Sequence, residues 1–300
     1  MKLSWQKFEI KDGRGFKVAD MDTASRKAKP GDDELKTMLE DDISVISSLQ
    51  FKLYAENKQS LLIVLQGMDS AGKDSAIKHI MSGINPQGLN VYSFKHPSAT
   101  ELAHDFLWRH TVKLPEKGQI VIFNRSHYEN VLISKVHPEI VLAERIPGIN
   151  KVEDISKGFW KERYEQINDF ERIVMKGGTH ILKFFLHLSK EEQRKRFLDR
   201  IEHKEKHWKF SSNDITERGY WGQYHQAYQD AIRHTSTAEA PWYVIPADDK
   251  WYAHLLMGKI MLEKMEGMNP HFPVIADSEK ALMEKAQIEL QREGDDHTGK

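Results

Sequence analysis

The chain has 300 residues, 39% of them hydrophobic and 30% charged, which is typical of one large or two small folded domains and excludes a disordered chain. It contains no cysteine, so disulfides, thiol nucleophiles and cysteine-bound metal centres are excluded. Lysine and arginine number 44 against 45 aspartate and glutamate, so a generally basic nucleic-acid coat is excluded, whereas a local basic channel is not.

No segment predicts a membrane span. The longest apolar run, from Leu61 to Leu65, is far shorter than the ~20 residues that a spanning helix requires. The residues that follow Met1 contain no apolar signal core. We therefore expect no membrane association and a cytoplasmic location.

The N-terminal third begins with an arm and a long helix. Residues 1–30 mix charges, glycines and turn formers, and they predict an extended arm that serves packing or assembly rather than chemistry. A helix is predicted from Pro30 to about residue 57, because apolar residues recur at three- and four-residue steps from Leu35 to Leu53.

Strand-like and helix-like segments alternate from residue 61 onward, as in parallel α/β proteins. The predicted strands are 61–65, 91–94, 120–123, 181–188 and 242–246. The predicted helices are 73–81, 98–107 (opened by a capping box at Ser98 and Glu101), 155–177, one after Ser189, and a last one from about 251. We expect a single three-layer α/β/α domain over residues 31–292, with about five parallel strands, and a polar tail over 293–300.

A phosphate-binding loop is predicted between the first strand and the helix after it. Gly67 to Lys73 match G-x-x-x-x-G-K, the Walker A pattern. The glycines allow a tight turn whose backbone N–H groups point inward, the helix offers its positive N-terminus, and Lys73 reaches the terminal phosphates. The phosphate-binding candidates are Gly67, Met68, Ser70, Ala71, Gly72, Asp74 and Ser75. The alternative is a glycine turn with a solvated lysine.

The loop departs from the usual pattern at two positions. Asp74 stands where Ser or Thr would place a hydroxyl on Mg²⁺, and Ser75 comes one residue late. Asp69 lies inside the loop, where a carboxylate repels bound phosphates unless it holds the metal that neutralises them. We therefore expect Asp69 to bind Mg²⁺, with Mn²⁺ as the alternative ion. A backbone hydrogen bond that stabilises the turn is the other explanation of Asp69.

The third predicted strand ends in a second cluster of polar residues. Asn124 replaces the acid that often holds metal at this strand tip. Asp69 therefore becomes the more important candidate for a metal ligand. Arg125 lies at the carboxyl end of a buried strand, where it is suited to clamp a phosphoryl group during transfer. The alternative for Arg125 is an ion pair with a helix carboxylate. Glu129 either holds metal or an acceptor group, or caps a helix, and His127 is expected to serve packing or to lie at the surface.

Three segments together resemble the polyphosphate kinase 2 family. They are Gly67 to Asp74, Phe123 to Glu129 and Ala240 to Trp251. Asn124 is similar to the class III branch, and the resemblance covers about residues 30 to 265. It implies a thymidylate-kinase-like P-loop fold with a helical lid, transfer from inorganic polyphosphate to nucleoside mono- and diphosphates, and a homotetramer. It also implies catalytic positions at Asp69, Lys73 and Arg125, and class-marking, nucleotide-binding positions at Asn124 and Glu129.

A basic helical lid is predicted over residues 189–212. Arg196, Arg200 and Lys204 are spaced four apart, so a continuous helix would place them on one face, and such a row suits a long polyanion. Arg218 and Lys78 are further polyphosphate candidates. The alternative is a solvated helix with i,i+4 ion pairs.

The second strand tip supplies candidates for the acceptor nucleotide. Lys95, His96 and Arg109 lie there and on the helix that follows. Contact with the nucleotide and a plain surface position are equally compatible with the sequence.

These observations favour an Mg²⁺-dependent, reversible phosphotransferase whose partners are polyphosphate and AMP, ADP, GMP or GDP. One alternative is a nucleoside monophosphate kinase that uses ATP, and another is a non-catalytic P-loop protein that binds nucleotides or polyanions. A nucleic-acid binder is the least favoured reading, because charge is balanced and no basic aromatic module is present.

Overall fold

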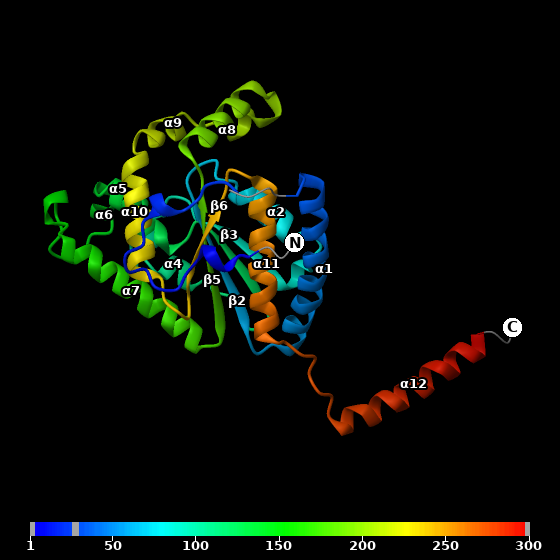
Figure 1. The fold of residues 1–300 in the computed structure, drawn as a ribbon. Helices are drawn as coiled ribbons and strands as arrows, with labels where there is room; N and C mark the ends of the chain where they lie inside the picture. The colour runs from blue at the N-terminus through cyan, green and yellow to red at the C-terminus, as the bar shows by residue number, and fades with distance from the viewer. Residues whose placement is uncertain (1–3, 26–29, 298–300) are drawn as a thin grey trace.

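A six-stranded sheet forms the centre of the computed structural model, which describes residues 4–25 and 30–297 (Figure 1). The strands are β1 (Glu9–Ile10), β2 (Ser60–Gly67), β3 (Leu89–Ser93), β4 (Ile120–Asn124), β5 (Thr179–His187) and β6 (Trp242–Pro246), and their order in space is β1-β6-β5-β2-β4-β3. The five predicted parallel strands are confirmed. The N-terminal arm adds a sixth, β1, which pairs antiparallel with β6, so the arm is part of the sheet rather than simply extended.

Helices cover both faces of the sheet. The longer ones are α1 (Asp32–Glu56), α2 (Lys73–Ile80), α7 (Lys157–Lys176), α8 (Lys190–Glu202), α9 (Ser212–Gly219), α10 (Trp221–Thr235), α11 (Lys250–Met268) and α12 (Asp277–His297). The short α-helices are α3 (Ala99–Leu102), α4 (Trp108–Thr111), α5 (Ile133–Val136) and α6 (Glu139–Leu142), and the 3₁₀ turns used below are η4 (His127–Val131) and η6 (Lys204–Lys209).

Two apolar layers follow from the alternation of side chains along each strand. Leu61, Ile63 and Leu65 face the layer built with α1, α2 and α11, whereas Leu62 and Val64 face the layer built with α7 and α10. Because β2 is buried on both faces, it has the continuous apolar run that the sequence shows. The α/β class and the three layers are therefore confirmed.

The helix predicted over residues 98–107 is shorter in the structure. The capping box at Ser98 and Glu101 is present, but α3 ends at Leu102 and not at Leu107. The side chain of Asp105 accepts a hydrogen bond from the backbone N–H of Leu107 (2.9 Å), which starts a new turn and interrupts the helix.

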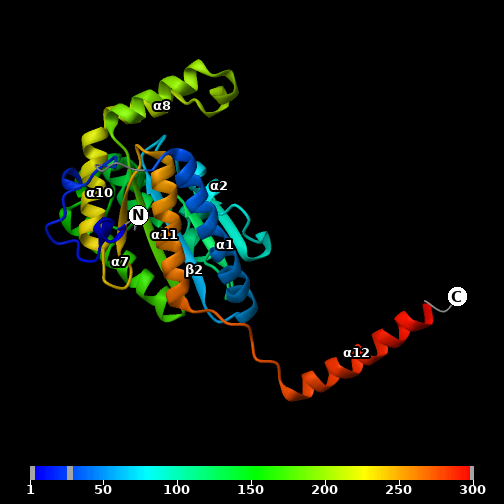
Figure 2. The same ribbon diagram turned by 45° about the vertical axis from the view of Figure 1, so that its right-hand side comes forward.

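The helix predicted from about residue 251, which is α11, was expected to be the last, and this is wrong, because α12 follows it. Figures 1 and 2 show α12 extending away from the sheet and its covering helices. It continues to His297, through part of the predicted polar tail, and residues 298–300 lie outside the described residues. Within the described ranges, no helix is long and apolar enough to cross a membrane.

Two buried histidines make stability depend on pH. His187 and His254 are only 3% and 4% exposed. Burial, with His225 beside it, lowers the pKa of His187 to about 4, and burial, with His79 beside it, lowers the pKa of His254 to about 4. The unfolded side chains, with an ordinary pKa of 6.5, bind protons that the folded protein excludes between these two values.

The free energy of unfolding is therefore expected to fall as the pH falls from 6.5 towards 4. At about pH 5 each histidine should cost about 2 kcal/mol relative to neutral pH. Urea unfolding at the two pH values measures the difference. A His254→Gln variant should lose the part of the dependence that His254 contributes, and an unchanged dependence would contradict the assignment.

Candidate active site

The carboxyl ends of β2 and β4 bring the two predicted motifs together. The two strands are adjacent and parallel, with Leu65 opposite Asn124. The loop after β2 and the turn after β4 therefore share one edge of the sheet, where α/β folds bind their ligands. Asp69 and Arg125, 56 positions apart in the chain, form an ion pair of 2.9 Å at this edge.

The loop from Gly67 to Lys73 has the backbone of a phosphate cradle. Gly72, the N-cap residue before α2, has a φ of 101°, a conformation that a residue with a Cβ rarely adopts. Ser70 has a φ of 64°, and its buried hydroxyl has no hydrogen-bond partner among the described residues. The loop thus presents its backbone and one unsatisfied hydroxyl at a helix N-terminus, as an anion site requires.

Lys73 is folded back onto the loop. Its ammonium group donates to the carbonyl oxygens of Gly67 at 2.7 Å and Met68 at 3.3 Å. Burial, together with the positive charge of Arg125, lowers the pKa of Lys73 below its ordinary value. Lys73 is half-buried, and a phosphate in the loop would add to the negative charge of the nearby carboxylates of Asp69, Glu129 and Asp74.

Arg125 occupies a strained position at the tip of β4. Its φ is 60°, which costs a residue other than glycine about 1–3 kcal/mol. Although burial acts in the opposite direction, the carboxylates of Glu129 and Asp69 raise the pKa of Arg125 above its ordinary value. Burial in turn raises the pKa of Glu129, against the effect of Arg125 and Lys73. Strain at a charged residue facing a phosphate loop is typical of a functional position.

Asn124 at the tip of β4 is in direct contact with Asp74 of the phosphate loop. The Asn124 amide donates to the Asp74 carboxylate at 2.8 Å and to the Ser93 hydroxyl at 3.3 Å. An aspartate at position 124 would place two carboxylates in contact. The departure at Asp74 in the loop and the replacement at Asn124 of the strand tip therefore form one interaction, which spacing along the sequence did not reveal.

The lid helix α8 is attached to the loop by Arg196. Its guanidinium donates to the carbonyl oxygens of Ser70 at 3.0 Å and Ala71 at 3.2 Å, and to that of Ala247 at 2.6 Å beyond β6. It also pairs with Glu192 at 2.9 Å and is buried. Arg196 thus clamps the loop from behind, and the prediction that it lies in a row facing polyphosphate does not fit this position.

The other predicted lid cations are also not in one row. Because α8 ends at Glu202, Lys204 falls in η6 and does not continue the face of Arg200. Arg200 pairs with Asp214 of α9 at 3.2 Å, and the proximity of Asp69, added to burial, raises the pKa of Asp214. Lys204 is exposed.

Arg218 donates to the carbonyl oxygen of Lys190 at 2.7 Å and to Gln193 at 2.9 Å. Gln193 donates to the Asp69 carbonyl oxygen at 2.9 Å, so this buried glutamine links the lid to the loop. The sequence analysis missed Gln193, and no signal marked it. Lys78 is exposed in the last turn of α2, and Ser75 lies in its first turn.

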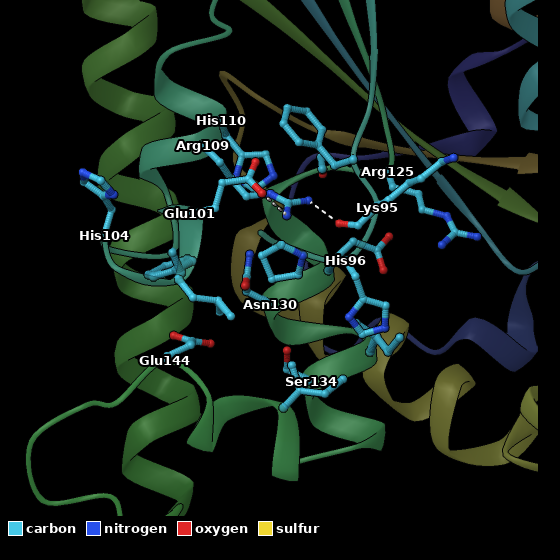
Figure 3. A pocket seen from close by; sticks show the side chains of 18 of the residues that line it. Lys95, His96, Glu101, His104, Arg109, His110, Arg125, Asn130, Ser134 and Glu144 are labelled. Atoms are coloured by element: carbon cyan, nitrogen blue, oxygen red, sulfur yellow. Dashed lines mark hydrogen bonds and ion pairs between the residues drawn. The ribbon is translucent and has the colours of Figure 1, made fainter. Parts of the chain in front are cut away.

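A cavity that is open to solvent adjoins Arg125. His96, Arg109 and Glu129 line it, with Lys95 and Phe94 (Figure 3). Arg109 is held by the Lys95 carbonyl oxygen at 2.7 Å and by Glu101 at 3.6 Å. The structure thus brings three of the four predicted nucleotide-binding residues, His96, Arg109 and Glu129, to one cavity beside the loop. The fourth, Asn124, does not line this cavity and contacts Asp74 and Ser93 instead.

A buried ion pair supports the turn that carries Arg125. The Lys183 ammonium donates to Glu171 at 2.7 Å, to Tyr128 at 3.2 Å and to the Thr235 carbonyl oxygen at 2.7 Å. The Tyr128 hydroxyl also donates to Glu171 at 2.7 Å, and the His127 ring lies 3.4 Å from the same carboxylate. His127 is therefore a core residue, and the network fixes η4 directly after Arg125.

The donor set suits Mg²⁺ better than a metal held by protein alone. Among the described residues, no group of three histidines, aspartates or glutamates could hold an ion. Mg²⁺ is usually bound by one or two carboxylates and takes its other ligands from phosphates and water. Asp69, partly exposed beside the cradle, fits that role.

Comparison with known proteins places the chain among relatives. The sequence model of the family described as Polyphosphate kinase 2 (PPK2) matches residues 29–273. An ADP-polyphosphate phosphotransferase of Rhodopseudomonas palustris is 46% identical over 273 residues, which are 91% of this chain and 93% of that protein. An AMP/ADP-polyphosphate phosphotransferase of Meiothermus ruber is 45% identical over 228 residues, which are 76% of this chain and 80% of that protein.

The fold has a matching solved structure. The crystal structure of Polyphosphate Kinase 2 from Arthrobacter aurescens superposes with a TM-score of 0.83 at 35% sequence identity, covering 94% of this chain and 97% of that one. The expected P-loop kinase fold is thereby confirmed.

Proposed function

This chain belongs to the polyphosphate kinase 2 family, and from that membership we propose that it transfers the terminal phosphoryl group of inorganic polyphosphate to nucleoside mono- and diphosphates. The observation that supports this most directly is the ion pair of Asp69 with Arg125, which joins a phosphate cradle to the cavity lined by His96, Arg109 and Glu129. The alternative of a passive polyanion binder does not account for a strained arginine at the junction of the two.

The transfer follows from the positions of the two phosphates. Polyphosphate ends in the loop of residues 67–73, and the nucleotide places its terminal phosphate beside Arg125. An oxygen of that phosphate attacks the terminal phosphorus of polyphosphate, a new P–O–P linkage forms, and the shortened chain leaves with the electron pair of the broken P–O bond. The attacking oxygen is already ionised, so no general base is required. The reaction is reversible because both sides contain the same kind of bond.

Lys73 and Arg125 stabilise the charge that spreads over the transferred group. Asp69 is proposed to hold Mg²⁺ or Mn²⁺, which supplies neutralising charge to the phosphates. Asn124 donates a hydrogen bond to Asp74 and, being neutral, adds no second negative charge beside that carboxylate. Glu129 is a charged neighbour of Arg125.

An assay of donors separates this function from its alternatives. The protein is incubated with Mg²⁺, each nucleoside mono- and diphosphate, and either polyphosphate or ATP, and products are identified by chromatography. We expect phosphorylated nucleotides with polyphosphate as donor. Products formed with ATP alone would favour a nucleoside monophosphate kinase, and binding without products would favour a sensor.

Arg200 is expected to bind polyphosphate by exchanging its partner. A phosphate of the incoming chain replaces Asp214, because a polyanion attracts the guanidinium more strongly than one carboxylate does. We therefore expect Arg200→Glu to raise the KM for polyphosphate about tenfold or more and the KM for the nucleotide less than about twofold. Steady-state kinetics with each substrate varied in turn measures both values. Arg194→Glu, at an exposed pair with Glu191, is the control, and equal effects on both substrates would count against the exchange.

Self-association is the last part of the proposal. Four apolar side chains on α12 are at least half exposed: Leu282, Met283, Ile288 and Leu290. Most of the stability of a helix in a protein comes from packing of its apolar face, so we expect a second chain to cover them. We expect light scattering to give a multiple of the chain's 34.9 kDa, and deletion of residues 277–300 to lower that multiple. A monomeric full-length chain would refute the homo-oligomer.

A further inference from the structure

One residue that lines the cavity beside Arg125, Glu144, belongs to an ion pair that the transfer itself does not use. Glu144, which follows α6, lines the cavity, and its carboxylate pairs with the guanidinium of Arg163 on α7. Their side chains are 12% and 4% exposed. Figure 3 shows Glu144 and Ser134 at the opposite end of the cavity from Arg125.

The direction in which a nucleotide lies in this cavity follows from the position of the loop. The reacting phosphate must be beside Arg125, since Arg125 is in contact with Asp69 of the loop. The sugar and base then extend along η4 and α5, where Ser126, Asn130 and Ser134 line the cavity at four-residue steps. The base therefore lies at the end that contains Glu144.

The carboxylate of Glu144 is fixed in place. Arg163 packs over the ring of Phe106 at 4.0 Å and lies 4.9 Å from the ring of Phe159. Phe106 itself lines the cavity, so the guanidinium is held behind an apolar wall. A carboxylate held by such a partner cannot turn away, and it can only accept hydrogen bonds.

We infer that Glu144 selects the nucleobase by accepting a hydrogen bond from an amino group at the edge of the base that is distant from the sugar. The inference rests on the proposed function for the identity of its ligand. The 6-amino group of adenine or the 4-amino group of cytosine gives the carboxylate a further donor beside Arg163, whereas a base without a donor at that position leaves the remaining lone pairs of the buried carboxylate unsatisfied. A site built in this way discriminates strongly against the analogue that lacks the donor.

The test uses two nucleotides that differ by one group. AMP and purine riboside 5′-monophosphate have the same ring system, and the second lacks the 6-amino group. Both kcat/KM with polyphosphate and the dissociation constant by titration calorimetry are measured. We expect the wild-type protein to prefer AMP about 10- to 100-fold in both, as a hydrogen bond to a charged acceptor requires.

The variants separate recognition from folding. Glu144→Met combined with Arg163→Met removes the pair without leaving an unpaired buried charge, and it should reduce the preference to about onefold. Glu144→Gln keeps the shape and a neutral acceptor, so it should reduce the preference several-fold, and it decides the matter if the double variant does not fold. Glu139→Gln, on the exposed side of α6, is the control and should leave the preference unchanged.

The outcomes distinguish this inference from the proposed function. Equal use and equal binding of the two nucleotides by the wild-type protein would overturn the inference and leave the proposed function intact. A preference that survives in Glu144→Gln and in the double variant would also overturn it. Absence of transfer from polyphosphate would refute the proposed function, and the dissociation constants would still decide the role of Glu144.

Discussion

Replacement of Asp69 by alanine is expected to lower kcat about 10³-fold. The carboxylate is proposed to hold the metal that neutralises the phosphates, a contribution of several kcal/mol at about 1.4 kcal/mol for each factor of ten. It also orients Arg125 across 2.9 Å. Because Asp69 is partly exposed, its ion pair adds little to stability, so the thermal midpoint should not change.

Initial rates over a range of Mg²⁺ concentrations provide the measurement. We expect the Mg²⁺ concentration needed for half-maximal rate to rise, which a purely structural loss would not cause. Asp33→Ala, at a fully exposed carboxylate on α1, is the matched control and should behave as the wild type. Near-normal turnover of Asp69→Ala would overturn the metal assignment.

Replacement of Lys183 by methionine should have the largest effect on stability. Lys183 and Glu171 are 0% and 3% exposed, and removal of one partner leaves the other charge buried without compensation. Such a loss costs about 3–5 kcal/mol. The thermal midpoint should fall by about 10 °C, and the turn after Arg125 should loosen, so kcat should fall more than the nucleotide KM rises.

The double variant Lys183→Met with Glu171→Leu tests the reason for this effect. With both charges absent, the apolar side chains should restore most of the lost stability. The pKa of Glu171 leads to a further prediction. Although burial raises this pKa, Lys183 and His127 lower it below its ordinary value. The stability that Glu171 contributes is therefore present above pH 4.5 and lost as the pH falls below it. A double variant as unstable as the single one would show that the pair is not the cause.

Much of the site could be predicted because its residues are neighbours in the chain. The loop from Gly67 to Lys73 could be identified from consecutive residues, since a tight turn before a helix needs glycines at fixed positions. Arg125 was identified in the same way, because a polar residue that directly follows a buried strand must lie at the sheet edge.

Spacing along the sequence was less informative about where a helix ends and about what a side chain on it faces. The four-residue steps of Arg196, Arg200 and Lys204 predicted a shared face, but they could not show that α8 ends at Glu202. They also could not show that Arg196 faces the loop carbonyl oxygens rather than a ligand. The capping box at Ser98 was correct as a start, whereas the end of that helix depended on the turn at Asp105.

The sequence by itself determined the positions of the five parallel strands along the chain, the phosphate loop and the arginine beside it, because these depend on local backbone chemistry. The tertiary structure alone decided the Asn124–Asp74 contact, the buried Lys183–Glu171 pair, the Arg196 clamp and the position of Glu144. Each of these joins side chains that are 12 or more positions apart in the chain. Their partners are set by how helices pack on the sheet, which no periodicity within a single segment records.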